Sequence, residues 1–380
     1  MPYWRLSAVY FCYFAVVGVM SPYWGLYLEA LDFRPSEIGL LSAIPMVTKL
    51  AAPNIWGALA DASGRRLAII RFGALGACLC FMGIFFSQQY LWLIAVTVSF
   101  SFFWNAILAQ FEVVTLSHLG DQAHQYSRIR VWGSVGFIVT VVILGWVFEM
   151  ISVRYLPVVL FLFLVGILIS ALALPAESTR TRSGESTGFL RQLLRPRIIW
   201  FFTVFTFLQI GHGVYYTFYS IYLESFDYSR TAIGLLWALG VLAEIYIFMK
   251  MPALFQRYSL AGMLQLSLLL TAVRWFLTGW FPEYPLIVTL VQLIHALSFG
   301  VTHAVAIEYV RLAFGRRAQG QGQAFYSAIC FGGGNAVGAY VSGLLWEPNP
   351  LWAFGFAVAV TLVALVMAMV FLPAKHFSRD

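Results

Sequence analysis

Charged residues are scarce in this sequence. Asp, Glu, Lys and Arg account for 10% of its 380 residues, against about 25% in a typical soluble domain. Apolar residues account for 61%, including 34 Phe and 13 Trp, and a water-soluble fold of that composition would expose very large apolar patches. We therefore expect an integral membrane protein. Twelve spans of roughly 20 residues would use about two thirds of the chain and leave no room for a separate catalytic or ATPase domain.

The signature motifs of ATP-driven pumps and of zinc proteases are missing. The only lysines are Lys49, Lys250 and Lys375, and none follows a glycine, so the G-K-[ST] core of a nucleotide-binding P-loop is impossible. H-E-x-x-H does not occur, which leaves a zinc protease without support. The one G-x-S-x-G match, residues 184–188, lies in a polar stretch and not between a strand and a helix as a lipase-type hydrolase requires. We predict that the protein is not an enzyme, that it needs no organic cofactor, and that ATP hydrolysis is not its energy source.

Cysteine is also rare, and its spacing argues against a metal cluster or a disulfide framework. The four cysteines all fall in apolar runs: Cys12, Cys78, Cys80 and Cys330. Free cysteine is among the most buried residue types. We therefore expect buried free thiols and no metal site.

The apolar runs are long enough for helices that cross a bilayer. A transmembrane helix needs about 20 apolar residues, and twelve runs meet this condition. They cover residues 5–29, 37–60, 67–86, 90–117, 128–149, 154–174, 197–223, 230–250, 260–280, 284–311, 320–345 and 350–372. The first run is longer than the roughly 7–15 residues of a signal-peptide core and lacks an A-x-A-like cleavage site, so we interpret it as the first helix.

The distribution of basic residues predicts the orientation. Twelve spans place both ends of the chain on one side. With that side inside, 18 of the 23 Lys and Arg residues are cytoplasmic and three are outside, which is the bias that cytoplasmic loops show. We predict a multi-pass protein of the cell inner membrane with both termini in the cytoplasm. The basic residues are scattered over the loops and form no single basic face, so we expect no binding of nucleic acid.

The chain divides into two related halves. Residues 175–196 form the longest polar stretch, whose Ser, Thr, Gly and charged residues are typical of an exposed linker. This linker separates a predicted N-terminal six-helix half, 1–174, from a C-terminal six-helix half, 197–380. The segment 23–41 aligns without gaps on 218–236. Two repeated halves with a site near the membrane midplane are typical of secondary transporters.

The loop between the second and third spans carries a compact motif, which consists of Gly57, Asp61, Gly64, Arg65 and Arg66. Gly57 would let a neighbouring backbone approach, Gly64 would allow a tight turn, and Asp61 could pair with a basic residue or cap a helix. A latch between two conformations is one interpretation, and a generic basic cytoplasmic loop is the other. The pattern resembles the Gly-x-x-x-Asp-x-x-Gly-Arg-Arg/Lys loop of the major facilitator superfamily, which implies the all-α, twelve-helix major facilitator fold.

Five further segments resemble the phenylpropionate permease family of that superfamily. They are YSRIRVWGSVGFI (126–138), LQIGHGVYYTFYSIYL (208–223), IGLLWALGVLAEIYIF (233–248), AVRWFLTG (272–279) and VQLIHALSFGVTHAVAI (291–307). The resemblance extends over essentially the whole chain, and nucleoside and lactose permeases are similar at a greater distance. It implies symport by alternating access, with protons as the coupling ion and a small organic solute such as an aromatic carboxylate as the substrate.

Ionisable residues inside the spans are candidates for function, because a charge at a helix centre costs about 2.5–3.5 kcal/mol on insertion scales. Glu244 lies near the middle of span eight and Arg274 lies in span nine, where the two could pair. Burial favours a protonated carboxyl group and a nearby guanidinium favours a carboxylate, so helix movement could load or release a proton. A purely structural pair is the alternative. The order of Glu, Arg and His on spans eight, nine and ten resembles the lactose permease, which implies proton coupling by Glu244, Arg274, His303 and His295.

Three histidines lie in spans seven and ten. Histidine is the side chain that titrates near neutral pH, so we predict that at least one of them binds substrate or relays a proton; a satisfied interhelical histidine is the alternative. His295 and His303 are eight residues apart, about 80° around an α-helix, and should not share a face. Gln209 precedes His212 by three and should share its face. Tyr216 could stack on a substrate ring or belong to an interface belt.

The first half adds further candidates. Asn105 and Glu112 are seven apart on span four, which lines the central cavity in the superfamily plan. Glu112 and Glu308 could instead pair with arginines at the cytoplasmic ends of their spans. Lys49 is the repeat mate of Glu244 and could meet an anionic substrate or balance a carboxylate.

Two glycines of span eleven, Gly334 and Gly338, form a small-xxx-small pattern. This pattern predicts close packing of two helices inside a membrane. A nucleotide-binding loop is excluded, because the glycines lie within a span.

The sequence thus predicts a monomeric transporter with a small-molecule substrate and membrane lipid as its partners. The substrate-binding candidates are His212, Gln209, Asn105, Tyr216 and Lys49. A nucleoside or sugar symporter and a proton-antiport exporter are alternatives with the same fold. A receptor or a lipid-processing enzyme without transport is an alternative of another class.

Overall fold

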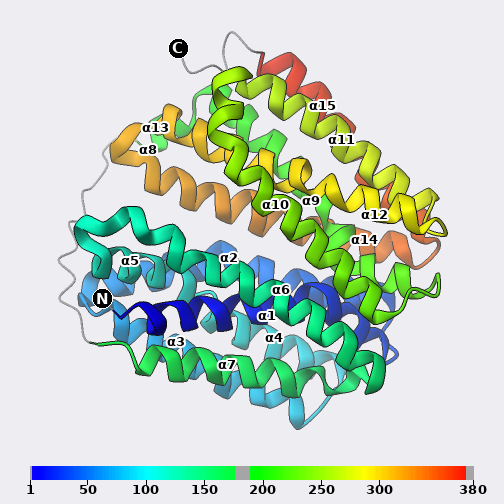
Figure 1. Cartoon of the computed structure of the whole chain (residues 1–380), viewed down its shortest axis with the longest axis horizontal. Coiled ribbons are helices and arrows are strands. Elements are labelled where there is room, and N and C mark those ends of the chain that lie inside the picture. The colour runs from blue at the N-terminus through cyan, green and yellow to red at the C-terminus, as the bar shows by residue number, and fades with distance from the viewer. Residues whose placement is uncertain (1, 176–188, 374–380) are drawn as a thin grey trace. The chain divides into compact units, whose positions relative to one another are not determined.

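The structure is a computed structural model that describes residues 2–175 and 189–373. All regular elements in these two ranges are helices, and twelve helical segments are long and apolar enough to cross a membrane (Figure 1). The predicted all-helical membrane fold with twelve spans is confirmed. Most of the predicted linker, residues 176–188, lies outside the described residues, and its role as the boundary between two halves stays a prediction.

Each span consists of one to three helical elements. The first six spans are α1 (Tyr3–Glu29), α2 (Pro35–Ser63), α3 with η1 (Arg66–Phe81, Met82–Phe85), α4 with α5 (Tyr90–Trp104, Ile107–Leu119), α6 (Tyr126–Met150), and η3 with α7 (Val153–Tyr155, Leu156–Leu172). The next three are α9 (Pro196–Glu224), α10 (Arg230–Arg257) and α11 (Leu260–Trp280). Span ten consists of α12 (Pro285–Leu293), η4 (Ala296–Val301) and the first part of α13 (Thr302–Tyr326). Span eleven consists of the rest of α13 with η5 (Ser327–Gly334) and α14 (Asn335–Trp346), and span twelve is α15 (Pro350–Phe371). The short helices η2 (Gly120–Gln125) and α8 (Phe189–Leu193) lie in connections, and α13 bends at Gly315 between spans ten and eleven.

The chain forms two compact units with the same internal pairing of helices. The first unit contains the spans up to α7 together with residues 228–235, and the second contains α8, α9 and the residues from 236 onward. In the first unit α1 packs along α6 and α7. In the second unit α9 packs along α14 and α15. The first span of each unit therefore contacts the fifth and sixth spans of the same unit, as an internal repeat requires.

The repeat extends to a single backbone turn. Asp32 and Asp227, which the sequence alignment matches, have φ angles of 64° and 61°, and no other non-glycine residue in the described ranges has a positive φ. The amide of Asp32 donates to the carbonyl of Glu29 at 2.8 Å, and the amide of Asp227 donates to that of Glu224 at 3.1 Å. Aspartate is one of the few residues that adopts this left-handed conformation. The two turns confirm the repeat that the sequence predicts.

The left-handed turn predicts the effect of a substitution at Asp227. Alanine at this φ of 61° should cost about 1–2 kcal/mol, because its Cβ crowds the carbonyl oxygen and it has no polar side chain to compensate. Glycine has no Cβ, so Asp227→Gly should unfold close to the wild type. Thermal unfolding of both purified variants in detergent checks this order, and an alanine variant as stable as the glycine variant would contradict it.

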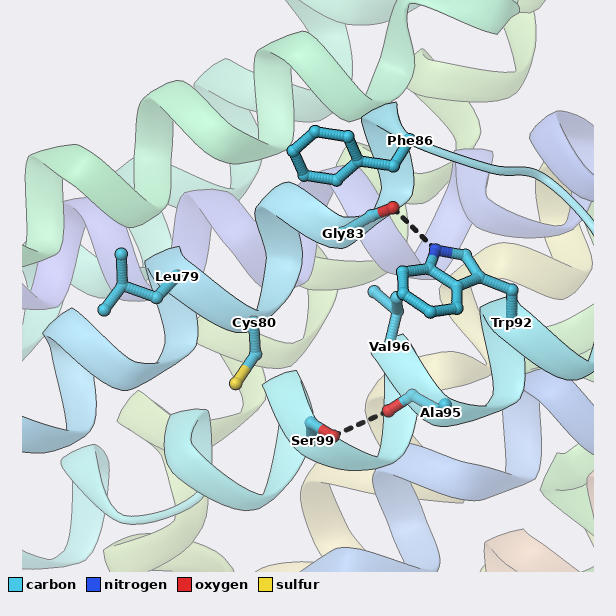
Figure 2. A pocket seen from close by; sticks show the side chains of 8 residues that line it. All are labelled: Leu79, Cys80, Gly83, Phe86, Trp92, Ala95, Val96 and Ser99. Atoms are coloured by element: carbon cyan, nitrogen blue, oxygen red, sulfur yellow. Dashed lines mark hydrogen bonds between the residues drawn. The ribbon is translucent and has the colours of Figure 1, made fainter.

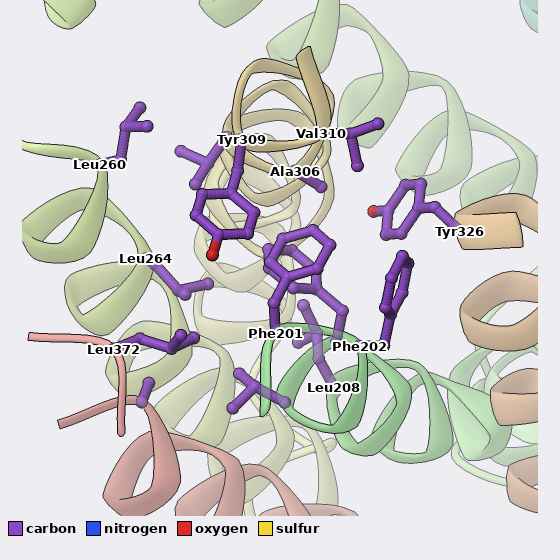
Figure 3. Close-up of a cluster of buried hydrophobic side chains, with 14 of the residues drawn as sticks. Phe201, Phe202, Leu208, Leu260, Leu264, Ala306, Tyr309, Val310, Tyr326 and Leu372 are labelled. Carbon is purple, nitrogen blue, oxygen red and sulfur yellow. The ribbon is translucent and has the colours of Figure 1, made fainter. Parts of the chain in front are cut away.

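The second unit has a large aromatic core, part of which Figure 3 shows. Phe201 and Phe202 of α9 lie among side chains of α11 and α13, including Leu264 and Tyr309. Lipid tails are as apolar as these side chains, so packing rather than exclusion from water must hold such helices together. The core fixes α9 against the helices that carry the polar residues described below.

The predicted glycine packing in span eleven is confirmed. A Cβ at Gly334 would lie 2.9 Å from the carbonyl oxygen of Thr206, and a Cβ at Gly338 would collide with the carbonyl of Ile210. On the facing helix, a Cβ at Gly213 would collide with the backbone of Gly338. The backbones of α9 and α14 approach each other as closely as they do only because these positions have no side chains.

Candidate functional site

Arg274 on α11 is the centre of a buried polar network in the second unit. The residue has no exposed surface. Its Nη1 donates to Ser298 Oγ at 2.9 Å and to His295 Nδ1 at 3.2 Å, and its Nη2 donates to Gln292 Oε1 at 3.3 Å. The guanidinium also lies over the ring of Tyr215, 4.3 Å from its centre. A buried cation is tolerated when it is hydrogen-bonded in this way, and the aromatic face adds to its stabilisation.

Gln292 on α12 fixes the orientation of the Arg274 guanidinium and of the neighbouring tyrosine hydroxyl groups. Its Oε1 accepts from both Arg274 and the hydroxyl of Tyr215, the latter at 3.2 Å, while its Nε2 donates to the hydroxyl of Tyr219. An amide can satisfy these neighbours in only one of its two flips. Gln292 is not among the residues that the sequence predicts for the site. The sequence does contain a feature that could have identified Gln292. It is a polar residue in an apolar run, three positions before His295, and Gln209 precedes His212 by the same spacing.

His295 lies between Arg274 and Glu244. Its Nε2 is 3.6 Å from Glu244 Oε2, and its Nδ1 faces Arg274. The Glu244 side chain is 18% exposed. Its carboxylate is therefore the partly accessible end of the series of contacts that runs from Arg274 through His295 to Glu244. The sequence predicts that Glu244 and Arg274 come close together. The structure brings both to the same imidazole, which joins α10, α11 and span ten.

The prediction that His295 and His303 lie on different faces is wrong. Both rings stack on Phe299, with centroid distances of 5.5 and 5.9 Å and interplanar angles of 12° and 9°. The reason is that η4 is a π-helix, whose wider turn brings residues four and eight apart onto one face. Such turns are frequent at functional sites. His303 is therefore on the same face as the network but separated from it by the Phe299 ring.

The predicted substrate contacts on α9 are mostly buried in helix packing. His212 has no exposed surface, its Nδ1 donates to the carbonyl four residues earlier at 2.9 Å, and its ring meets Trp275 edge-on at 5.0 Å. Gln209 accepts from Asn335 Nδ2 at 2.9 Å. Tyr216 is only half-buried, and its ring lies 6.0 Å from that of His212. Of these three candidates, Tyr216 alone presents accessible surface.

Asn105 in the first unit joins α4 to α2. It follows the last residue of α4, and its Nδ2 donates to the carbonyl of Pro45 at 3.1 Å and to Thr48 Oγ1 at 3.0 Å. The residue is buried. These contacts fix the break between α4 and α5, so the amide of Asn105 has a structural role in this conformation.

Lys49 and Glu112 belong to a second group of charges in the first unit. The two side chains interact electrostatically, and Arg130 also acts on Glu112. The hydroxyl of Tyr126 lies 3.4 Å from Glu112 Oε1. Lys49 is partly exposed, as a group that meets an anionic solute must be.

Glu308 of span ten, the other glutamate that could pair with an arginine, has different partners. It forms an ion pair with Arg311, with nitrogen–oxygen distances of 2.8 and 2.9 Å, and the arginine side chain is 52% exposed. Pairing with a nearby arginine, one of the two interpretations of Glu308, is confirmed. Glu308 is itself only 11% exposed, and it pairs with an arginine of its own helix, whereas Glu112 lies near Lys49 and Arg130.

The loop motif forms a local ion pair in the first unit. Arg66 donates to Asp61 and to Gln110 on α5, and the arginine is buried while the aspartate is 46% exposed. Arg65 is exposed, and its amide donates to Ser63 Oγ at 3.3 Å. Asp61 thus pairs with the second arginine of the motif, and Gln110 is a further partner that the motif does not predict.

The two glycines of the motif differ in their roles. Gly64 ends α2 with a φ of 64°, and its amide donates to the carbonyl of Ala60 at 3.0 Å, so the predicted tight turn is confirmed. The prediction that a neighbouring backbone approaches Gly57 is wrong. The nearest atom to a Cβ there would be the side-chain Nε2 of Gln110 at 3.4 Å, because this amide reaches across from α5 to Arg66.

A recess of about 320 Å³ lies elsewhere in the first unit, between α3, η1 and α4 (Figure 2). Its lining is apolar apart from Cys80 and Ser99, and Leu79, Phe86 and Trp92 are largely exposed. The indole of Trp92 donates to the carbonyl of Gly83 at 2.7 Å. None of the predicted site residues lines this recess, and no charged side chain reaches it, so it is no part of the candidate site.

Comparisons with known proteins agree with this architecture. The profile of the MFS_1 like family matches residues 3–356. The chain is 29% identical to the protein named "Probable 3-phenylpropionic acid transporter" of Escherichia coli, over 95% of this chain and 96% of that protein. It is 26% identical to the maltose permease of Geobacillus stearothermophilus, over 95% and 92% of the two chains. The crystal structure of the nucleoside transporter NupG superposes with a TM-score of 0.85 at 16% identity and covers both chains completely.

Proposed function

From the premise that the chain belongs to the MFS_1 like family, we propose a transport reaction. The protein carries an aromatic carboxylate across the cell inner membrane together with protons. The protein is a membrane transporter of the major facilitator type. Proton coupling, the substrate class and uptake by alternating access are our proposal, as are the inner membrane and the cytoplasmic location of both termini.

The buried network around Arg274 is the observation that carries this proposal. A cation, an imidazole and a carboxylate lie in contact within three membrane spans. Charges at such depth are expensive and are usually retained for a function such as a proton relay. A carboxyl group and a guanidinium that interact through one imidazole can respond together to a proton, and this response is what coupling to a proton gradient needs.

Two observations support an aromatic carboxylate as the substrate. The relative of Escherichia coli is named for 3-phenylpropionic acid and matches nearly the whole chain. Tyr216 offers a half-buried aromatic ring, and Lys49 offers a partly exposed cation within its unit.

A neutral polyol or nucleoside is the second candidate substrate. It is favoured by the similarity to a maltose permease and to the fold of a nucleoside transporter. A neutral solute would need hydrogen bonds rather than a cation partner. Export by proton antiport is the corresponding alternative for the direction of transport.

Proteoliposomes that contain a pH-sensitive dye test the proposal directly. With the membrane potential clamped, external 3-phenylpropionate should acidify the lumen, whereas nucleosides and maltose should not. Liposomes without protein and a protonophore are needed as controls, because weak acids cross bilayers unaided. Acidification by a nucleoside or maltose alone would support the second candidate. Alkalinisation on addition of solute would indicate antiport.

Two lysines in different helices, Lys49 and Lys250, provide matched variants for the same assay. Lys49→Gln removes the partly exposed cation and should raise KM for the carboxylate at least about tenfold, the loss expected for one hydrogen bond to a charged group. Lys250→Gln changes an exposed lysine in the last third of α10 and should leave KM unchanged. Equal KM values for the two variants would show that Lys49 does not meet the substrate.

A further inference from the structure

A second recess lies at the surface of the second unit, next to the first turns of α9. Its volume is about 290 Å³, and six of its eight lining residues are apolar. Ile199 of α9 is 47% exposed and Ile329 of η5 is 37% exposed, so the recess is open to its surroundings. It is separate from the buried network, because neither Arg274 nor any of its hydrogen-bond partners lines it.

The polar groups that line this recess already have partners. The hydroxyl of Thr203 donates to the carbonyl of Ile199 at 2.9 Å, and the hydroxyl of Thr206 donates to Cys330 Sγ at 3.5 Å. Both hydroxyl hydrogens are therefore used within the protein. A polar solute that left water for this recess would lose hydrogen bonds without replacement, whereas a hydrocarbon chain has none to lose. The recess suits an acyl chain.

The recess lies on the side of α9 that faces away from the core of the unit. Ile199, Thr203 and Thr206 follow one another at helical spacing and share one face of α9. Phe201 belongs to the core, and two residues along an α-helix correspond to about 200° of rotation, so Thr203 lies nearly opposite Phe201. Because α9 is a membrane span, an open apolar surface on this side borders the acyl chains of the bilayer.

The segment that leads into the recess is basic. Arg191, Arg195 and Arg197 are all exposed, and no acidic residue occurs between positions 189 and 223. None of the ion pairs in the part of the chain that the structure describes includes one of these arginines. Basic residues directly beside a membrane span attract the headgroups of anionic lipids. The charge of this segment is therefore available to an anion at the membrane surface.

Two of these arginines lie at the edge of the recess. Arg195 is the N-cap residue of α9 and precedes Ile199 by four, so it continues the row of recess residues beyond the end of the helix. Arg191 belongs to the short helix α8, whose Phe189 packs against Phe325 of the recess with 6.3 Å between the ring centroids. Figure 1 shows α8 beside α13. A lipid with one chain in the recess would therefore have its phosphate beside both arginines.

Two other features of the protein have only half of this arrangement. Arg197 is also exposed, but it lies two residues beyond Arg195, on the other face of α9, where it acts electrostatically on Tyr309 of the core. The recess of the first unit has a similar volume and an apolar lining, but no charged side chain reaches it. A charge without a recess and a recess without a charge are therefore both present as controls.

We propose that the recess beside α9 is a binding site for one anionic phospholipid. One acyl chain occupies the recess, and the guanidinium groups of Arg191 and Arg195 bind the phosphate. Arginine suits this role because its fork of donors matches the oxygens of a phosphate group. The site does not depend on the proposed transport reaction, since it shares no residue with the network around Arg274.

Native mass spectrometry of the purified full-length protein tests the charge. Dioleoyl phosphatidylglycerol and dioleoyl phosphatidylcholine have the same chains and differ in the charge of the headgroup. The first phosphatidylglycerol should bind more tightly to the wild type than phosphatidylcholine does. Arg191→Gln and Arg195→Gln should each weaken it about fivefold, the contribution of one arginine at a membrane surface. Arg197→Gln removes the same charge from the other face of α9 and should leave the Kd close to that of the wild type.

Two further measurements test the acyl chain. Thr203→Phe fills the recess and should weaken the binding of phosphatidylglycerol although both arginines are present. Ser99→Phe fills the recess of the first unit and should leave that binding unchanged. Glycerol 3-phosphate has a phosphate but no acyl chain, so an excess of it should not displace the bound lipid.

Three results would overturn the proposal. Equal affinities for the two lipids would show that the headgroup charge is not recognised. A loss for Arg197→Gln as large as that for Arg195→Gln would show a general attraction to a basic segment and no site at the recess. Displacement by glycerol 3-phosphate would indicate a site for a soluble phosphate. The arginine variants change exposed side chains only, so they decide the question even if Thr203→Phe does not fold.

Discussion

Replacement of Arg274 by methionine is expected to abolish proton-driven accumulation and to destabilise the second unit. Methionine has a similar length but no donors. Its introduction would leave Ser298, His295 and Gln292 without the donor that each now accepts from. Removal of one member of a buried charged pair typically costs about 3–5 kcal/mol. Unfolding by SDS titration and uptake in proteoliposomes measure the two effects separately.

A double variant tells whether this cost comes from an uncompensated carboxylate. If Glu244 depends on Arg274 through His295, then Arg274→Met combined with Glu244→Gln should be more stable than the sum of the two single effects predicts. An interaction of about 1 kcal/mol or more is expected for residues in one network. The double variant should still fail to accumulate substrate, because it has neither the proton site nor the cation. Additive stabilities would indicate that the network does not connect the two residues.

Arg311 offers the matched control for this experiment. It is also an arginine paired with a glutamate, but its side chain is 52% exposed. Exposed ion pairs contribute about 0–1 kcal/mol. Arg311→Met should therefore unfold and transport nearly as the wild type does. A loss as large as that of Arg274→Met would mean that the assay responds to any change of charge.

The spans and the repeat could be predicted because they depend on properties that act over many residues. A bilayer requires about 20 apolar residues for each helix. A single polar residue such as Lys49 changes the mean hydropathy of a segment of that length only slightly, so the segment can still be identified as a span. The repeat was visible in matched acidic residues, and the positive φ of both Asp32 and Asp227 gives a physical reason for that match. These features need no knowledge of which side chains meet.

The contacts of the network could be predicted only in part. Hydropathy identifies Glu244 and Arg274 as unusual, and helix adjacency brings them near each other. It does not tell which group of span ten lies between them. An α-helical wheel gave the wrong face for His303, because the π-helix η4 changes the turn over six residues. Its sequence, ALSFGV, has no pattern that distinguishes a π-turn from an α-turn.

Hydrogen-bonding partners such as Gln292 and Gln110 were missed for a related reason. A neutral amide inside a span costs less than a charge, so it is a weaker signal. Its importance depends on whether a buried cation lies within reach. That information is three-dimensional, and it came from the contacts with Arg274 and Arg66.

Gly338→Ala is expected to be strongly destabilising although it adds a single methyl group. The new Cβ would collide with the backbone carbonyl of Ile210, and Gly213 on α9 faces the same point. Backbone atoms inside two packed helices cannot move aside as a flexible side chain can, so α9 and α14 would have to separate. Overpacking of this kind costs about 1–3 kcal/mol and occasionally more, and we expect the upper end of that range. The shift of α9 would also move Tyr215 away from Arg274, so uptake should fall as well.

Gly355→Ala is the control that makes this prediction specific. It introduces the same methyl group into a helix of the same unit, where the nearest atom to the new Cβ is a ring carbon of Trp280 at 3.7 Å. That distance is an ordinary contact, and alanine in a helix is favoured over glycine by up to about 1 kcal/mol. Gly355→Ala should therefore be neutral or stabilising in SDS unfolding, while Gly338→Ala is destabilising. Because helix propensity favours alanine at both positions, an opposite sign of the two effects can come only from the close approach of α9 and α14, and equal stabilities would show that these helices are free to separate.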